Sequence, residues 1–161
     1  MDWKTKFAVC KQLAEHDDDI WADFSVSDPA DAASVAALRK RLPNDYTEFL
    51  AMTDGADIAQ CILCGTSNFS NADEWYGDLF DSSQFSPFGW DAGGAPLLFD
   101  PNGAVYIGLS KISRESPRRL AASFASFFND VLTGRDYPTL FDEDPEDDEW
   151  YDFLCTQGWA L

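Results

Sequence analysis

The stretch from Leu42 to Gly55, LPNDYTEFLAMTDG, decides the fold of this chain. Pro43 suits the first turn of a helix, because its missing N–H has no partner to lose there. Gly55 can adopt the left-handed conformation that ends a helix. The apolar stripe between these two signals consists of Tyr46, Phe49 and Leu50, at helical spacing. The stretch therefore predicts a short helix with a start signal, one buried face and a stop signal.

Two later segments follow this helix in a definite order. FGWDAGGAPLLFDPNGAVYIG runs from Phe88 to Gly108, and RRLAASFASFFNDVLTG runs from Arg118 to Gly134. The succession of LP-x-x-Y-x-x-F-L, a glycine-rich stretch, a D-x-x-G hairpin and a Ser-Phe-x-x-Phe-Phe helix resembles the SUKH superfamily. That superfamily includes bacterial toxin-immunity proteins and yeast cell-wall-synthesis regulators. The resemblance covers roughly Leu38 to Gly134 and implies an α+β fold, an antiparallel-rich sheet flanked by helices.

Periodicity along the chain predicts the same class. Helical spacing predicts one helix over residues 2–16, a second from Asp28-Pro29 to Arg41, and a closing helix that begins at Ser116-Pro117 and buries Leu120 and Phe124. Strands are expected over residues 58–63, 85–90, 96–99 and 105–109, the last two joined by a hairpin at residues 100–103. Helices before and after an antiparallel sheet make an α+β domain.

The length suits one domain with a sizeable core, so residues 1–161 are expected to form a single SUKH-like unit. Its core is expected over about residues 38–134, with a helical N-terminal extension over 1–37. The acidic segment over 135–161 is expected to pack back on the domain, because its apolar residues would otherwise form an exposed patch. These residues are Trp150, Phe153, Leu154 and Trp159.

The distribution of charge restricts the partners. The net charge is −18, and residues 42–110 hold ten acidic residues but no Lys or Arg. Residues 142–152 hold eight carboxylates in eleven positions. Direct binding to nucleic acid or to an anionic membrane surface is disfavoured, because both depend on Lys and Arg. A basic protein partner complements the charge, although acidity for solubility alone is the competing interpretation.

No stretch approaches the roughly 20 apolar residues that cross a bilayer, and no secretory leader is visible. We therefore expect a cytoplasmic protein, and the resemblance to the immunity proteins of the SUKH superfamily implies a bacterial one.

The sequence gives little support for a catalytic site or a metal site. Cys61 and Cys64 have the spacing of a zinc half-site but lack a second pair, and on a continuous strand they would face opposite sides, so core packing is expected. His16 is the only histidine and falls at a helix end, where a surface role is expected. No cofactor, metal or catalytic residue is predicted. Among 29 acidic residues carboxylate pairs arise by chance, so a carboxylate-dependent hydrolase remains the least favoured alternative.

Aromatic and acidic residues mix in the middle of the chain, and aromatic side chains are enriched in binding hot spots. Part of this set would serve the core instead. The candidate partner-binding residues are Asp73, Glu74, Trp75, Tyr76, Asp78, Trp90 and Asp91.

The resemblance implies a non-catalytic immunity protein that binds a toxic domain, often a nuclease, and blocks its active site or substrate groove. A cognate basic toxin domain is thus the expected partner. The alternative is an intracellular regulatory or scaffold module of the same superfamily. The matching motif residues are mainly scaffold residues, so no binding site is carried over from the family.

Overall fold

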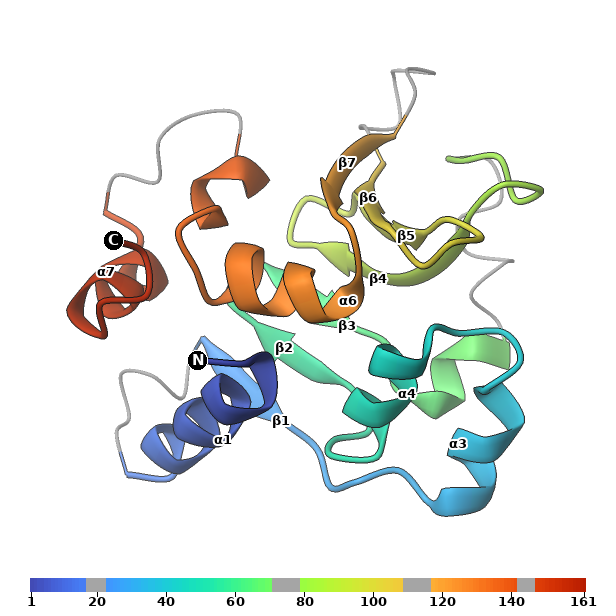
Figure 1. Cartoon of the computed structure of the whole chain (residues 1–161), viewed down its shortest axis with the longest axis horizontal. Coiled ribbons are helices and arrows are strands. Elements are labelled where there is room, and N and C mark those ends of the chain that lie inside the picture. The colour runs from blue at the N-terminus through green and yellow to red at the C-terminus, as the bar shows by residue number, and fades with distance from the viewer. Residues whose placement is uncertain (17–22, 71–78, 109–116, 142–146) are drawn as a thin grey trace.

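The computed structural model describes residues 1–16, 23–70, 79–108, 117–141 and 147–161. Its centre is a sheet of seven antiparallel strands in the order β1 to β7, so each strand pairs with the next one along the chain (Figure 1). The strands are β1 (Phe24–Val26), β2 (Ala56–Ile58), β3 (Cys61–Leu63), β4 (Ser86–Asp91), β5 (Pro96–Phe99), β6 (Val105–Ile107) and β7 (Arg118–Ala121).

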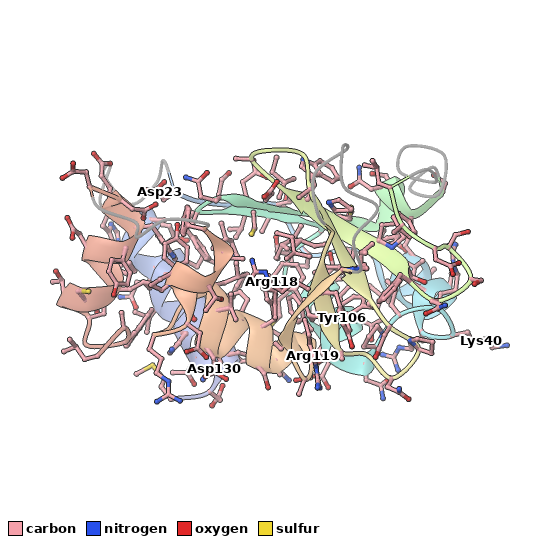
Figure 2. All side chains as sticks on the ribbon, turned by 90° about the horizontal axis from the view of Figure 1, so that it is seen from above. Asp23, Lys40, Tyr106, Arg118, Arg119 and Asp130 are labelled. Carbon is pink, nitrogen blue, oxygen red and sulfur yellow. The ribbon has the colours of Figure 1, made fainter. Side chains whose placement is uncertain are left out.

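Helices form a second layer on one face of this sheet, as the view from above shows (Figure 2). The helices are α1 (Trp3–Ala14), α3 (Ala32–Leu38), α4 (Asn44–Leu50), the 3₁₀ turn η1 (Thr66–Ser70), α6 (Phe124–Ser126), the π-helical η2 (Phe127–Leu132), the 3₁₀ turn η3 (Tyr137–Leu140) and α7 (Glu149–Thr156). The expected α+β fold with an antiparallel sheet and flanking helices is confirmed.

Tyr46 of α4 lies at the centre of the core, where it is fully buried. Its ring contacts five phenylalanine rings, the nearest being Phe124 at 4.8 Å between centroids. Its hydroxyl donates to the carbonyl oxygens of Cys64 (2.7 Å) and Phe88 (3.1 Å). Tyr46 thereby joins the helical layer to the neighbouring strands β3 and β4.

Removing this hydroxyl has a predictable cost. Tyr46→Phe leaves the buried Cys64 carbonyl group without a donor, whereas the Phe88 carbonyl oxygen keeps the Cys64 N–H, so we expect the free energy of unfolding to fall by about 1–3 kcal/mol. Tyr106→Phe is the matched control, because Tyr106 is half-buried and its hydroxyl has no hydrogen bond to a described residue. Urea unfolding of both variants measures the difference, and equal midpoints would show that the Tyr46 hydroxyl contributes nothing.

Residues 58–63 form two strands rather than the single strand predicted. Ala59 adopts a positive φ of 51°, and the chain turns back so that Ile58 pairs with Cys61. A tight turn without glycine or proline carries no sequence signal that separates it from a continuous apolar strand. The strands β1 and β7 were also missed, because each is short and lies at an edge of the sheet.

The prediction that the closing helix begins at Ser116-Pro117 was wrong. Residues 118–121 form β7 and pair with β6, and the helix begins at Phe124. Ser123 is the N-cap, and its side chain accepts a hydrogen bond from the backbone N–H of Ser126. Leu120 and Phe124 share a helical spacing, but pairing with the sheet prevails over that local pattern.

The two helix starts were each placed too early. The second helix begins at Ala32 and not at Asp28-Pro29, because the carboxylate of Asp31 accepts the N–H groups of Ala33 and Ser34. Pro43 lies just before α4 in extended backbone, so it is the cap residue and not part of the first turn. Gly55 has the expected left-handed φ of 92°, but it leads directly into β2.

Both ends of the chain contribute to the same core. Trp3 of α1 contacts Phe124 and Phe128. Trp150 of α7 stacks on Phe24 of β1, with 6.1 Å between the ring centroids. Trp150 and Leu154 are buried, and Phe153 and Trp159 pack partly against the core. In the part of the chain that the structure describes, no helix is long and apolar enough to cross a membrane.

Candidate protein-interaction surface

Several described carboxylates have structural roles in the fold. Asp2, Asp31 and Asp148 cap helices, whereas Asp81 and Asp100 accept backbone N–H groups within turns. Carboxylates in such positions stabilise orphan N–H groups at helix starts and in turns. A binding surface is therefore sought where several carboxylates gather without a cationic partner, even if one of them also caps a helix.

Asp91, one of the predicted binding residues, has a structural role of this kind. Its carboxylate accepts the backbone N–H of Ala95 at 2.7 Å and so closes the turn between β4 and β5. Neighbouring Trp90 pairs with Ile62 and Pro96 across the sheet, and its half-buried side chain packs partly against the core. The other predicted binding residues, Asp73, Glu74, Trp75, Tyr76 and Asp78, lie outside the described residues.

Three acidic residues from opposite ends of the sequence meet where β1 begins beside α7. We call Asp23, Asp148 and Glu149 the β1–α7 acidic surface. Burial raises the pKa of Asp23, and the charges of Asp148 and Glu149 raise it further. The Asp148 carboxylate also accepts the hydroxyl of Tyr137 at 3.1 Å, and burial together with this carboxylate raises the pKa of that phenol.

This arrangement destabilises the free protein. A carboxyl whose pKa rises on folding holds its proton more tightly in the folded chain, so ionised Asp23 disfavours folding at any pH above that raised value. This free-energy cost of folding decreases as the pH falls through the raised pKa of Asp23. No described Lys or Arg forms an ion pair with these three carboxylates. A cation supplied by a partner would relieve the repulsion.

Three of the basic residues lie at a distance from Asp23. Asp23 and Lys40 are at opposite ends, and Arg118 and Arg119 lie between them (Figure 2). Both arginines are exposed on the edge strand β7. The β1–α7 acidic surface, whose three carboxylates form no ion pair with a described Lys or Arg, is the candidate surface for a cationic protein. Sequence reasoning missed Asp23 because the two parts of this surface are more than a hundred positions apart.

Three of the described cysteines are buried in the core. Cys61 and Cys64 are buried in the core as expected, although β3 ends at Leu63 and the two do not share one strand. Burial raises the pKa of Cys10 and Cys64 to about 12 and also raises that of Cys61, so these thiols stay protonated. His16 is exposed after α1. Among the described residues no three potential ligands converge on a metal position.

Lys6 ties the N-terminal helix to η2. This buried side chain donates to the carbonyl oxygens of Asn129 (2.7 Å) and Thr133 (2.6 Å) at the end of η2, and its ammonium lies 5.2 Å from the Trp159 ring centroid. Burial lowers the pKa of Lys6, and the charge of Asp130 opposes that shift. A cation at a helix C-terminus satisfies orphan carbonyls and the helix dipole.

We expect Lys6→Met to lower the free energy of unfolding by about 1–3 kcal/mol, because the methionine keeps the packing but leaves both carbonyl groups unpaired. Lys4→Met is the matched control. Lys4 is half-exposed and pairs with Glu48 at 2.7 Å on the surface, so its loss should cost less than about 1 kcal/mol. Thermal unfolding compares them, and a Lys6 variant as stable as the Lys4 variant would contradict this role.

Two of the concavities on the described surface bear on binding. One is a groove of about 820 Å³ along β1, and the other is a cleft of about 400 Å³ between Lys40, Ser83 and the turn at Asn102. Asp23, the described carboxyl with a raised pKa, lines neither of them. The raised pKa of Asp23 therefore belongs to the β1–α7 acidic surface and not to either of these concavities.

Comparison with known families agrees with the fold. An α+β domain built on an antiparallel sheet, with an aromatic core and LP-x-x-Y helix, has the features of the SUKH superfamily. The family model described as SMI1 / KNR4 family (SUKH-1) matches residues 29–130, more than half of the chain. The chain belongs to this family. No curated protein matches it.

Proposed function

We propose that this chain is a non-catalytic protein-binding domain that acts as an immunity protein. It would bind the toxic domain of a polymorphic toxin, often a nuclease, and block its active site or substrate groove. Membership of the SUKH-1 family supports a protein-interaction role. The observation that carries the proposal is the β1–α7 acidic surface, where Asp23, Asp148 and Glu149 repel one another in the free protein.

The chemistry of the partner follows from this surface. Nuclease domains bind phosphates through Lys and Arg, so their grooves are cationic and attract carboxylates. Opposite fields raise the association rate and reject partners of the wrong charge. The residues predicted from the sequence stay part of the proposal as further candidate contacts: Asp73, Glu74, Trp75, Tyr76, Asp78, Trp90 and Asp91.

Further parts of the proposal concern context and organisation. The chain would act in the bacterial cytoplasm without a cofactor, as one unit whose family core carries an N-terminal helical extension and an acidic C-terminal segment. It would bind neither nucleic acid nor membranes directly, because the net charge of −18 repels both.

A regulatory or scaffold module is the second candidate. The matching family model is that of SMI1 / KNR4, and the resemblance drawn from the sequence includes yeast regulators of cell-wall synthesis. Such a module would make weaker contacts with several endogenous proteins. An immunity protein would instead form one tight complex, with a dissociation constant of about a nanomolar or below.

Affinity capture from the source organism separates these candidates. The tagged chain is incubated with lysate, washed at moderate salt, and its bound proteins are identified by mass spectrometry. One stoichiometric basic partner with a toxin-like C-terminal domain is expected, with association that slows at high salt. Several unrelated proteins, or no retained protein, would favour the regulatory module over the immunity protein. A Glu149→Lys bait tests whether capture depends on the acidic surface.

A further inference from the structure

The free edge of β1 faces a groove that no structural element of the described chain fills. Its volume is about 820 Å³. One wall is the continuous run of residues 24–28, and the other is the end of α1, where Lys11, Ala14 and Glu15 line it. A groove between an edge strand and a helix is a geometry in which proteins take up an extended segment as an additional strand.

The register of the sheet shows which backbone groups of β1 are available. The Ala59 N–H donates to the Asp23 carbonyl oxygen, and bonded pairs alternate along an antiparallel ladder. The next bonded pair is therefore Ser25 with Asp57. The N–H and C=O groups of Phe24 and Val26 consequently point away from β2, and no described residue bonds to them.

Phe24 and Val26 differ in how far they are buried. Phe24 is buried, so its unpaired backbone groups lie at the inner end of the groove, whereas Val26 is only half-buried. Buried backbone groups without partners cost free energy, which an added strand would recover. Val26 offers the first pair of hydrogen bonds to an entering segment.

The two edge strands of the sheet, β1 and β7, differ in their charged residues and in the proline beside them. At the other edge, β7 carries the exposed Arg118 and Arg119 and follows directly on Pro117. Charges and proline at an edge discourage pairing with another strand. The residues of β1, Phe24-Ser25-Val26, contain neither a charge nor a proline. The edge at β1 is thus the one suited to strand addition.

Charge selects the occupant of the groove. Glu15 and Asp28 line it together with a single described cation, Lys11, and Asp57 stands opposite Ser25 on the adjacent strand. The β1–α7 acidic surface adjoins the same strand at Asp23. A second copy of this chain would bring the same carboxylates against each other, with a net charge of −18 on each copy. A segment bearing lysine or arginine has the complementary charge.

We propose that β1 takes up an extended, cationic segment of a partner protein as an eighth strand, in the groove between β1 and the end of α1. The hydrogen bonds of Val26 give the segment its register, and Glu15 and Asp28 attract its basic side chains. The inference rests on the proposed function only for the identity of the partner. The groove itself suits a basic, strand-forming segment from any protein.

A peptide of eight alternating lysines and valines tests this inference on the full chain by NMR. We expect chemical shift changes at residues 24–28 and at Lys11 to Glu15, with slower hydrogen exchange of the Val26 amide on binding. The Ser25 amide, already bonded to Asp57, should keep its exchange rate. A peptide of alternating glutamates and valines should not bind. No binding by the lysine peptide, or shift changes confined to other elements, would overturn the proposal.

Two substitutions separate strand addition from general attraction to an acidic protein. Val26→Pro removes the N–H that would pair and should abolish binding. Glu15→Lys should weaken binding at least fivefold, whereas Glu48→Lys on α4 makes the same charge change outside the groove and should not. Equal affinities of the two lysine variants would overturn the proposal even if Val26→Pro fails to fold. If a captured partner bound Val26→Pro and Glu15→Lys normally, the proposed function would stand and this inference would fail.

Discussion

Trp150→Ala is expected to lower the free energy of unfolding by about 3–5 kcal/mol, in the range measured for truncated buried aromatic residues. Trp150 is 2% exposed, stacks on Phe24 with ring planes 9° apart, and contacts Phe153 at 5.0 Å. Its indole N–H donates to the Leu132 carbonyl oxygen at 2.8 Å. The substitution opens a cavity between α7 and β1 and also leaves a helix-terminal carbonyl unpaired.

Thermal unfolding measures this cost, and the midpoint should fall by about 6–20 °C for a domain of this size. Gln157→Ala is the control, because Gln157 is exposed at the end of α7 and its loss should cost less than about 0.5 kcal/mol. A Trp150 variant that melts with the control would show that α7 does not belong to the core. Trp150 lies beyond the residues of the family match, so this outcome also tests the reach of the folding unit.

Reversing one charge of the β1–α7 acidic surface is expected to have the largest effect on function. Glu149→Lys should slow association with a cationic partner about tenfold or more at low salt, because electrostatic steering raises such rates by about 10 to 1,000-fold. The same change places a cation beside Asp23 and removes one cause of its raised pKa. Binding should therefore weaken while the repulsion at Asp23 in the free chain decreases.

Glu48→Lys is the matched control for net charge. Glu48 lies on α4 and pairs with Lys4, away from the acidic surface, so this variant should associate with nearly the wild-type rate. Stopped-flow association with the captured partner, at low and at high salt, measures both variants. Equal rates for the two would contradict the placement of the interface at β1 and α7, even if overall acidity still contributed.

The sequence predicts the parts of this fold that carry local signals. The hairpin at residues 100–103 has Pro101 and Gly103, whose φ is 84°, and both strands beside it are present. The apolar stripe of α4 is present for the same reason, because three aromatic and aliphatic side chains recur at helical spacing. Such features depend on neighbours within one turn, so one sequence suffices to find them.

Features that depend on tertiary pairing could not be predicted. The turn at Ala59 lacks glycine, and β7 carries a pattern that also fits a helix. In both places pairing across the sheet decides the outcome. The position of the β1–α7 acidic surface also depends on tertiary contacts. The acidic run before Trp150 is visible in the sequence, but its approach to Asp23 depends on Trp150 stacking on Phe24. Asp91, a predicted binding residue, closes a turn, and this role was not visible in the sequence.

The measurement that tests the central proposal most directly is protection of growing cells. The captured partner's C-terminal domain is expressed alone, with the wild-type chain, and with the Glu149→Lys variant at equal levels. We predict that the partner alone arrests growth, that the wild-type chain restores it, and that the variant restores it less. A partner that is harmless alone, or a toxic partner against which the wild-type chain gives no protection, would contradict an immunity function.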